Sequence, residues 1–230
     1  MKYLIIGNGK VANNFANYLS LLKIPFEKWD RNTDVSLEKS VQDCNTALIL
    51  IKDSEIDGFI EDNPPLKDKK LVHFSASLDS NFAQSIHPLA SFTENLKTLE
   101  EYKNIPFITH EGEPSFSEIF PTLENPSHQI PKEKAALYHA LCVASGNFTV
   151  LLWQEVFKKF EIDLNMPIEF PLAYFDNISK NIKEDHKKAL SGPIDRKDMQ
   201  TIEHNLKALQ DDKLETIYKA FVKEYLDEKK

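Results

Sequence analysis

Tyr3-Leu4-Ile5-Ile6-Gly7-Asn8-Gly9-Lys10-Val11-Ala12 is the stretch of sequence that decides the fold. Its four leading apolar residues predict a short strand, and the amphipathic pattern from about Val11 to Leu22 predicts a helix. Between the two, residues 7–12 match the G-x-G-x-x-G/A pattern of a dinucleotide-binding strand–turn–helix unit. In this pattern the first glycine permits a tight turn, and the second lets a diphosphate approach the backbone. The N-terminus of the helix then offers free N–H groups to the phosphates.

From this pattern we expect a cofactor turn that binds NADP or NAD through Gly7, Asn8, Gly9, Lys10, Val11 and Ala12. The alternative is a glycine turn in a domain that has lost its cofactor.

The residues after the second predicted strand, 25–29, bear on the choice of cofactor. They are Asp30 and Arg31, followed by Asn32. An acidic residue at this point bonds the ribose hydroxyls of NAD, whereas an arginine neutralises the 2′-phosphate of NADP. Because Arg31 is present, we favour NADP (NADPH) over NAD. The alternative is that Arg31 is only a solvated turn residue.

Further apolar runs alternate with helical patterns through the first half of the chain. Strands are predicted over residues 46–51, 71–74 and 106–109, which favours βαβ units and a parallel sheet. The composition changes near Pro131, after which helices are predicted over residues 132–160, 171–190, 198–209 and 212–226. We therefore expect an α/β protein, with a Rossmann-type parallel-sheet domain over residues 1–130 and an all-α domain over residues 131–230.

Composition narrows the class of protein. A net charge of −8 disfavours a general nucleic-acid binder, because phosphate contacts need a dominant basic face. The two distant cysteines, Cys44 and Cys142, and the absence of a leader peptide predict a reduced, cytoplasmic protein. No uninterrupted stretch of about 18 apolar residues occurs, so no membrane span is expected. The histidines lack zinc-ligand spacing, so no metal is expected either.

Several short motifs follow the cofactor turn in order along the chain. They are residues 53–56, 73–76, 86–89, 138–140, 145–147 and 191–198, with His204 after them. With these motifs the chain resembles the Rossmann-like reductases whose second half is a helical domain of unknown function. That family lies in the 6-phosphogluconate dehydrogenase-like superfamily, whose members include ketopantoate reductase and pyrroline-5-carboxylate reductase. The resemblance covers nearly the whole chain.

The chain departs from the family pattern at three positions. Ala76 and Lys197 stand where the pattern prefers glycine. Val143 stands four residues before Asn147, where many relatives place a catalytic lysine. A lysine-based mechanism therefore cannot be carried over to this chain.

Polar residues follow the third and fourth predicted strands. Asp53, His73 and Ser75 should lie near the carboxyl edge of the sheet, where ligands bind in open parallel sheets. We expect Asp53 and Ser75 to contribute to cofactor binding. The competing interpretations are that both cap the helices that follow them, and that His73 is structural.

The resemblance and the reaction together suggest the remaining site residues. Reduction by a nicotinamide needs a hydrogen-bond or proton donor at the heteroatom, and His87, His139, Asn147 and His204 are the candidates. Asn147 and His87 are expected to contact the substrate as well, and Arg196 could clamp its carboxylate. For each histidine the alternative is a structural role with satisfied hydrogen bonds.

Together these features predict an NADPH-dependent reductase of a small anionic carbonyl compound. The best single substrate implied by the resemblance is ketopantoate (2-dehydropantoate), which would place the protein in pantothenate and coenzyme A synthesis. Two alternatives stay open: an imine reductase resembling pyrroline-5-carboxylate reductase, and a non-catalytic NADP-binding redox sensor. A homodimer through the C-terminal helices is also expected, because the helix after Pro131 is apolar around much of its circumference.

Overall fold

The computed structural model describes residues 2–227, and contacts divide the chain into two compact units, Met1–Leu151 and Leu152–Lys230. The division falls inside helix α7 (Phe148–Ile162) and not at Pro131, where the composition changes. Pro131 marks instead the point where the helical part of the chain begins, directly before the 3₁₀ turn η3 (Lys132–Lys134).

The first unit contains a five-stranded parallel sheet in the order β2-β1-β3-β4-β5. Its strands are β1 (Tyr3–Ile6), β2 (Phe26–Trp29), β3 (Thr46–Ile49), β4 (Lys70–His73) and β5 (Gln84–Ser85). Four of these were predicted from the sequence to within two residues, and the parallel sheet is confirmed. The fold is of the Rossmann type, and all its strands end at one edge.

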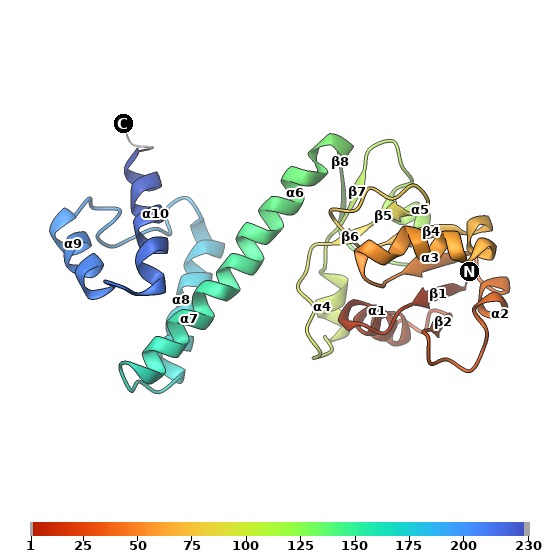
Figure 1. Cartoon of the computed structure of the whole chain (residues 1–230), viewed down its shortest axis with the longest axis horizontal. Helices are drawn as coiled ribbons and strands as arrows, with labels where there is room; N and C mark the ends of the chain where they lie inside the picture. The colour runs from red at the N-terminus through yellow and green to blue at the C-terminus, as the bar shows by residue number, and fades with distance from the viewer. Residues whose placement is uncertain (1, 228–230) are drawn as a thin grey trace. The chain divides into compact units, whose positions relative to one another are not determined.

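Helices pack on both faces of this sheet (Figure 1). Tyr3 and Ile5 point into the core shared with α1 (Lys10–Leu21), whereas Leu4 and Ile6 point into the core shared with α3 (Ile56–Asp62). Successive strand residues face opposite sides, so a strand covered on both sides must be apolar throughout. The short helix α2 (Leu37–Gln42) and the 3₁₀ turns η1 (Asp53–Glu55) and η2 (Pro64–Asp68) complete this part.

A second, three-stranded sheet follows. Its strands are β6 (His87–Pro88), β7 (Phe107–His110) and β8 (Ser127–Ile130), with β6 antiparallel and β8 parallel to β7. The apolar run predicted as a strand near residue 107 is therefore a strand, but of this sheet and not of the parallel one. Phe107 packs against Phe116 of α5 (Phe116–Ile119) with ring centroids 4.5 Å apart. Strand β6 is held beside β7 by the pairing of His87 with Ile108 and of Pro88 with Phe107. Helix α4 (Leu99–Lys103) contributes Tyr102 to the same core as Phe107 and Phe116.

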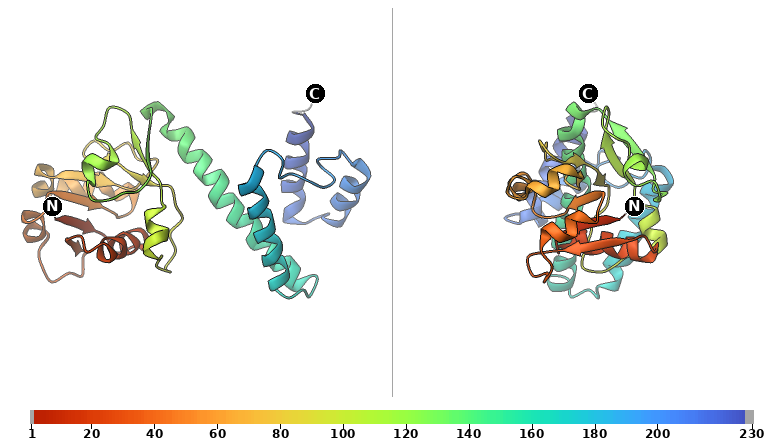
Figure 2. Two further views of the ribbon diagram at one scale, coloured as in Figure 1. Left: turned by 180° about the vertical axis from the view of Figure 1, so that it is seen from behind. Right: turned by 90° about the vertical axis from the view of Figure 1, so that its right-hand side faces the viewer.

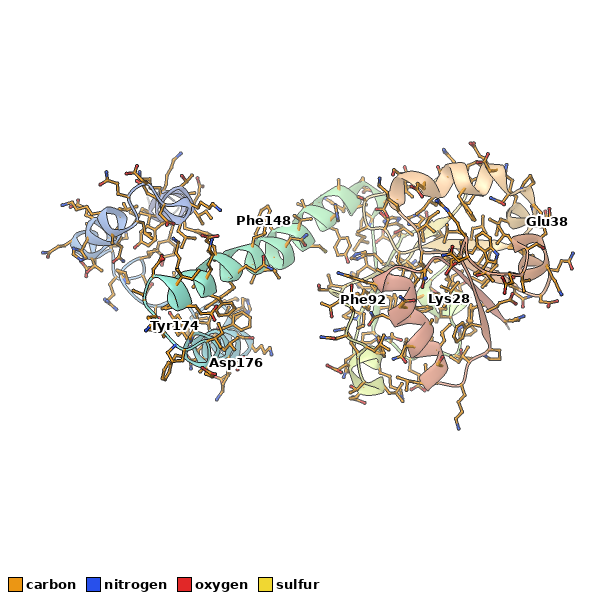
Figure 3. The ribbon with its side chains drawn as sticks, turned by 60° about the horizontal axis from the view of Figure 1, so that its bottom comes forward. Lys28, Glu38, Phe92, Phe148, Tyr174 and Asp176 are labelled. Carbon is orange, nitrogen blue, oxygen red and sulfur yellow. The ribbon has the colours of Figure 1, made fainter. Side chains whose placement is uncertain are left out.

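The helical part begins with α6 (Ala135–Cys142), a π-helical turn η4 (Val143–Asn147) and α7. Residues 135–154 contain no Asp, Glu, Lys or Arg, and Phe148 is 59% exposed (Figure 3). By length and composition alone, the helix Lys132–Ile162 could cross a membrane, with a mean hydropathy of 1.5 and none of its apolar window buried. Its apolar residues do not form an uninterrupted stretch, because small and polar residues are interspersed among them, and the sequence pattern therefore did not predict it. A single helix of this kind is weak evidence for a membrane span.

Within its described residues the second unit consists of helices joined by loops and contains no strand, as the sequence predicted. Helix α8 (Glu169–Asp185) runs back alongside α7 (Figure 2), where Trp153 packs edge-on against Phe175 with centroids 4.9 Å apart. Helices α9 (Met199–Ala208) and α10 (Lys213–Asp227) follow. An ion pair between Lys159 and Asp212 joins the end of α7 to the start of α10.

Candidate functional site

Two cavities flank the glycine turn at the carboxyl edge of the parallel sheet. The larger has a volume of about 560 Å³ and the smaller about 240 Å³. The larger is lined by Gly9, Lys10, Val11, Ile49, Leu50, Ile51, Lys52, Asp53, Ile56, Phe74, Ser75, Ala76, His87 and His139. The smaller is lined by Ile6, Gly7, Asn8, Trp29, Asp30, Arg31, Asn32, Ile51 and Phe59. All of these residues belong to the first unit.

The two glycines of the turn have different physical roles. Gly7 has a φ of +130°, and a Cβ there would lie 2.9 Å from the carbonyl carbon of Leu50 and closer still to its oxygen. Only glycine fits this position. Gly9 has an ordinary φ of −78°, and nothing lies within 4 Å of the place where its Cβ would be. The structure therefore requires Gly7 for the turn itself, whereas at Gly9 it leaves open space.

Helix α1 begins at this open space, and the backbone N–H groups of its first turn are not capped by a side chain of the described residues. Gly9 is the N-cap residue, and among the described residues no side chain accepts a hydrogen bond from the first turn. Ala12 is fully buried against the sheet, which brings the helix close to it. Unsatisfied N–H groups at a helix N-terminus attract anions.

Lys28 places a cation beside the glycine turn. The sequence analysis did not predict this contribution of Lys28. Its ammonium donates to Asn8 Oδ1 at 2.6 Å and to Asn13 Oδ1 at 2.5 Å, and it lies beside α1 in Figure 3. The signal in the sequence was a lysine in the second half of a strand whose end adjoins the glycine turn. Lys10 adds a second cation at the larger cavity.

The residues predicted to choose between NAD and NADP lie at the smaller cavity. Asp30 Oδ1 accepts a hydrogen bond of 2.8 Å from the Asn32 N–H, which fixes the loop. The Arg31 side chain is 84% exposed and pairs with Glu55, with 3.3 Å between Nη2 and Oε2. Exposed pairs of this kind contribute little to stability, so Arg31 can exchange Glu55 for another anion at small cost.

Asp53 and Ser75 are hydrogen-bonded to each other at the larger cavity. Ser75 Oγ donates to Asp53 Oδ2 at 2.5 Å and accepts from the N–H groups of Ser77 and Leu78. The competing interpretation, that both residues cap helices, is wrong for the described chain. The segment after Ser75 is irregular, and the Asp53 carboxylate makes no capping bond to η1. Their link instead ties the ends of β3 and β4 together.

His73 is buried beneath these residues. Its Nδ1 accepts from the Ser75 N–H at 3.2 Å, while Nε2 has no partner in the part of the chain that the structure describes. Burial, opposed mainly by the charge of Asp53, lowers the pKa of His73 to about 4. His73 is therefore neutral at pH 7 and does not line either cavity, which favours its structural role.

We expect the buried imidazole of His73 to make the protein sensitive to acid. The unfolded chain binds a proton at an ordinary pKa of 6.5, whereas the folded chain resists protonation down to about 4. Stability is therefore full above pH 6.5 and falls as the pH drops through 6.5 towards 4, by up to about 3 kcal/mol. The variant His73→Asn keeps an acceptor near Nδ1. Its free energy of unfolding, measured by urea denaturation, should depend less steeply on pH than that of the wild type. The exposed His128→Asn is the control, and equal slopes in all three proteins would contradict the assignment.

His87 and His139 also line the larger cavity. His87 Nδ1 lies 2.6 Å from the hydroxyl of Tyr138, and the two rings meet edge to face. Burial, with the charge of His139 as a second cause, lowers the pKa of His87 to about 4. Tyr138 was part of a family motif in the sequence, but its contact with His87 is visible only in the fold.

Asn147, His204 and Arg196 are not among the described residues that line the two cavities of the first unit. Asn147 is exposed in the π-helical turn η4, a type of distortion that is frequent at functional sites. His204 and Arg196 are exposed in the second unit. Nearby, Asp198 caps α9 by accepting from the Thr201 N–H at 3.1 Å. Lys197 has a φ of +54°, which explains the family preference for glycine there. Residues 2–227 contain no group of three His, Cys, Asp or Glu side chains arranged to hold a metal.

Comparisons with known proteins agree with this architecture. The family described as "Domain of unknown function (DUF2520)" matches residues 108–225. A Bacteroides fragilis protein crystallised as a candidate NADP oxidoreductase is 19% identical, with 97% of each chain covered and a TM-score of 0.76. An imine reductase from Myxococcus stipitatus in complex with NADP⁺ is 10% identical, covering 99% of this chain and 93% of its own (TM-score 0.66).

The same fold extends to a further reductase. Plasmodium falciparum pyrroline carboxylate reductase with NADP bound is 11% identical, with 98% of each chain covered and a TM-score of 0.57. No curated protein matches the chain. At these levels of identity the structural comparisons establish the fold.

Proposed function

The chain belongs to the DUF2520 family, and from the site in its first unit we propose that it is an NADPH-dependent reductase of a small anionic carbonyl compound. The observation that carries the proposal is the cofactor turn, which has open space at Gly9 between two cavities. A dinucleotide has two halves joined by a diphosphate. Its adenosine half would occupy the smaller cavity, and its nicotinamide half the larger.

The charges around the turn support a diphosphate between the two cavities. The free N-terminus of α1, Lys28 and Lys10 supply positive potential in a chain whose net charge is −8. Three proteins of the same fold are described by their names as NADP oxidoreductases or as reductases with NADP bound. The bound cofactor would supply the hydride, and this chain's residues would orient the substrate and exclude water.

NADPH preference is assigned to Arg31, which would exchange Glu55 for the 2′-phosphate. Arg31→Ala should weaken NADPH binding about tenfold, because a charge-assisted bond to phosphate is worth roughly 1.5 kcal/mol. NADH has no 2′-phosphate, so its affinity should change less than twofold. Isothermal titration calorimetry with both cofactors measures the difference. The exposed Lys39→Ala on α2 controls for the loss of one charge, and equal weakening of NADPH and NADH by Arg31→Ala would exclude the assignment.

The larger cavity suggests the substrate class. Lys10 and Lys52 favour an anion, and His87 and His139 offer hydrogen-bonding groups. Ketopantoate is our best single substrate within this class. Asn147 and His204 stay proposed site residues, as does Arg196, which is proposed to bind the substrate carboxylate, and all three side chains are exposed.

Turnover separates the candidate functions. Oxidation of NADPH with ketopantoate or other 2-oxo acids, followed as loss of nicotinamide absorbance, is the expected result. Activity confined to cyclic imines would favour the imine reductase, a name that some proteins of this fold carry. Tight NADPH binding without turnover over the whole panel would favour the redox sensor.

We also propose that a second copy of the chain covers the apolar helix in a cytoplasmic homodimer. Leu137, Leu141, Phe148 and Leu151 are each more than half exposed, and no charged residue interrupts them. Large exposed apolar patches mark interaction sites. Light scattering should give twice the 26.5 kDa mass of one chain. A monomer that binds lipid vesicles would instead favour a membrane surface.

A further inference from the structure

We propose that Tyr138 is a positioning residue that holds His87 with its proton on Nε2, so that the larger cavity presents a neutral hydrogen-bond donor to a substrate carbonyl oxygen. The inference rests on the proposed function for the identity of the ligand. The contact on which it depends lies within the first unit and needs no cofactor.

The geometry brings the two side chains together from separate elements. His87 is on β6 and Tyr138 is on α6, 51 residues later. Nδ1 and the phenol oxygen are 2.6 Å apart, and the rings are 5.5 Å apart at 78°. The other ring nitrogen, Nε2, makes no hydrogen bond to the described residues, and His87 lines the cavity. The ring is thus held at one edge, and its other edge is available to a ligand.

The chemistry of the pair fixes which atom carries the proton. A neutral imidazole has one N–H and one basic nitrogen, and the basic nitrogen is a much better acceptor than a phenol oxygen. The phenol O–H of Tyr138 is also a stronger acid than the imidazole N–H of His87. Burial raises the pKa of Tyr138, which keeps its hydroxyl protonated. Tyr138 therefore donates to Nδ1, and the proton of His87 resides on Nε2.

A neutral donor at this position selects for a substrate atom with a free lone pair. A carbonyl oxygen has lone pairs, whereas the nitrogen of a protonated imine has none. When hydride adds to the carbonyl carbon, the π electrons move to the oxygen, and a donor already in place stabilises the developing charge. The protonated imine would instead bring its own N–H against the N–H of His87. The pair thus favours carbonyl over iminium reduction.

Nitrogen-15 NMR of the full-length chain tests the proposal directly, with the His87 signals assigned by their loss in His87→Asn. Without cofactor, wild-type His87 should carry its proton on Nε2 and show a hydrogen-bonded Nδ1. In Tyr138→Phe, which retains the ring, the Nδ1 signal should move to the position of a free acceptor, and the share of the Nδ1–H tautomer should rise several-fold. Tyr174→Phe, on α8 in the second unit, should leave both unchanged. A wild-type proton on Nδ1, or a Tyr138→Phe spectrum identical to wild type, would overturn the proposal.

The substrate class is tested in the same spectra. Saturating 2-oxobutyrate added to the NADP⁺-loaded protein should shift the His87 Nε2–H signal, and its affinity should fall about tenfold in Tyr138→Phe. A signal that does not move overturns the carbonyl assignment. Failure of NADP⁺ itself to bind would count against the proposed function and would leave the tautomer result standing.

Discussion

Gly7→Ala should destabilise the first unit by roughly 3–5 kcal/mol, a large part of the stability of an ordinary domain. Two costs add at this position. The φ of +130° lies in a region that L side chains rarely adopt, and the new methyl group would collide with the Leu50 carbonyl. Because that carbonyl belongs to the backbone next to β3, it cannot move aside without disturbing the sheet. Urea denaturation of the purified variant measures the loss.

Gly112→Ala separates the two costs. Gly112 also has a positive φ, of +82°, but nothing lies within 4 Å of the place where a Cβ would be. This variant should lose only about 1–2 kcal/mol, the conformational cost alone. If Gly7→Ala were no less stable than Gly112→Ala, the close approach of Gly7 to Leu50 would not exist in solution.

Gly9→Asp should abolish cofactor binding and leave the fold intact. Gly9 has an ordinary backbone conformation with open space around it, and aspartate is a favourable N-cap residue. The fold should therefore keep or gain stability. The new carboxylate would bind the N–H groups at the start of α1 and place a negative charge where the diphosphate would lie. We expect NADPH affinity to fall at least 100-fold, about 2.7 kcal/mol or more.

Calorimetric titration with NADPH, alongside a thermal melt, checks both parts of this prediction. Gly58→Asp is the matched control, because Gly58 also has open space but lies on α3 and lines neither cavity in the described structure. It should bind NADPH as the wild type does. Undiminished NADPH binding by Gly9→Asp would mean that the diphosphate lies elsewhere.

The cofactor turn could be predicted from sequence because its requirements are local. A short apolar strand, Gly7, Gly9 and an amphipathic helix follow one another within a few residues, and each has a known physical role. The parallel strands were predictable for the same reason. Strand β7 was predicted as a strand, but its place in a second sheet depends on packing around Phe107, which local pattern does not encode.

The larger cavity could be predicted only in part. Asp53 and Ser75 follow neighbouring strands, so topology alone places them at one edge. The pairing of His87 with Tyr138 joins a short strand to a distant helix, and no spacing rule predicts it. Lys28 was missed because a charged residue in a strand is usually interpreted as a solvated side chain.

A calorimetric titration of the full-length chain with NADPH is the decisive experiment for the cofactor site. We expect saturable binding of one NADPH per chain with a dissociation constant in the micromolar range, and weaker binding of NADH. Absence of saturable binding of either nucleotide at millimolar concentration would contradict the proposed function, because the open turn at Gly9 would then hold no dinucleotide.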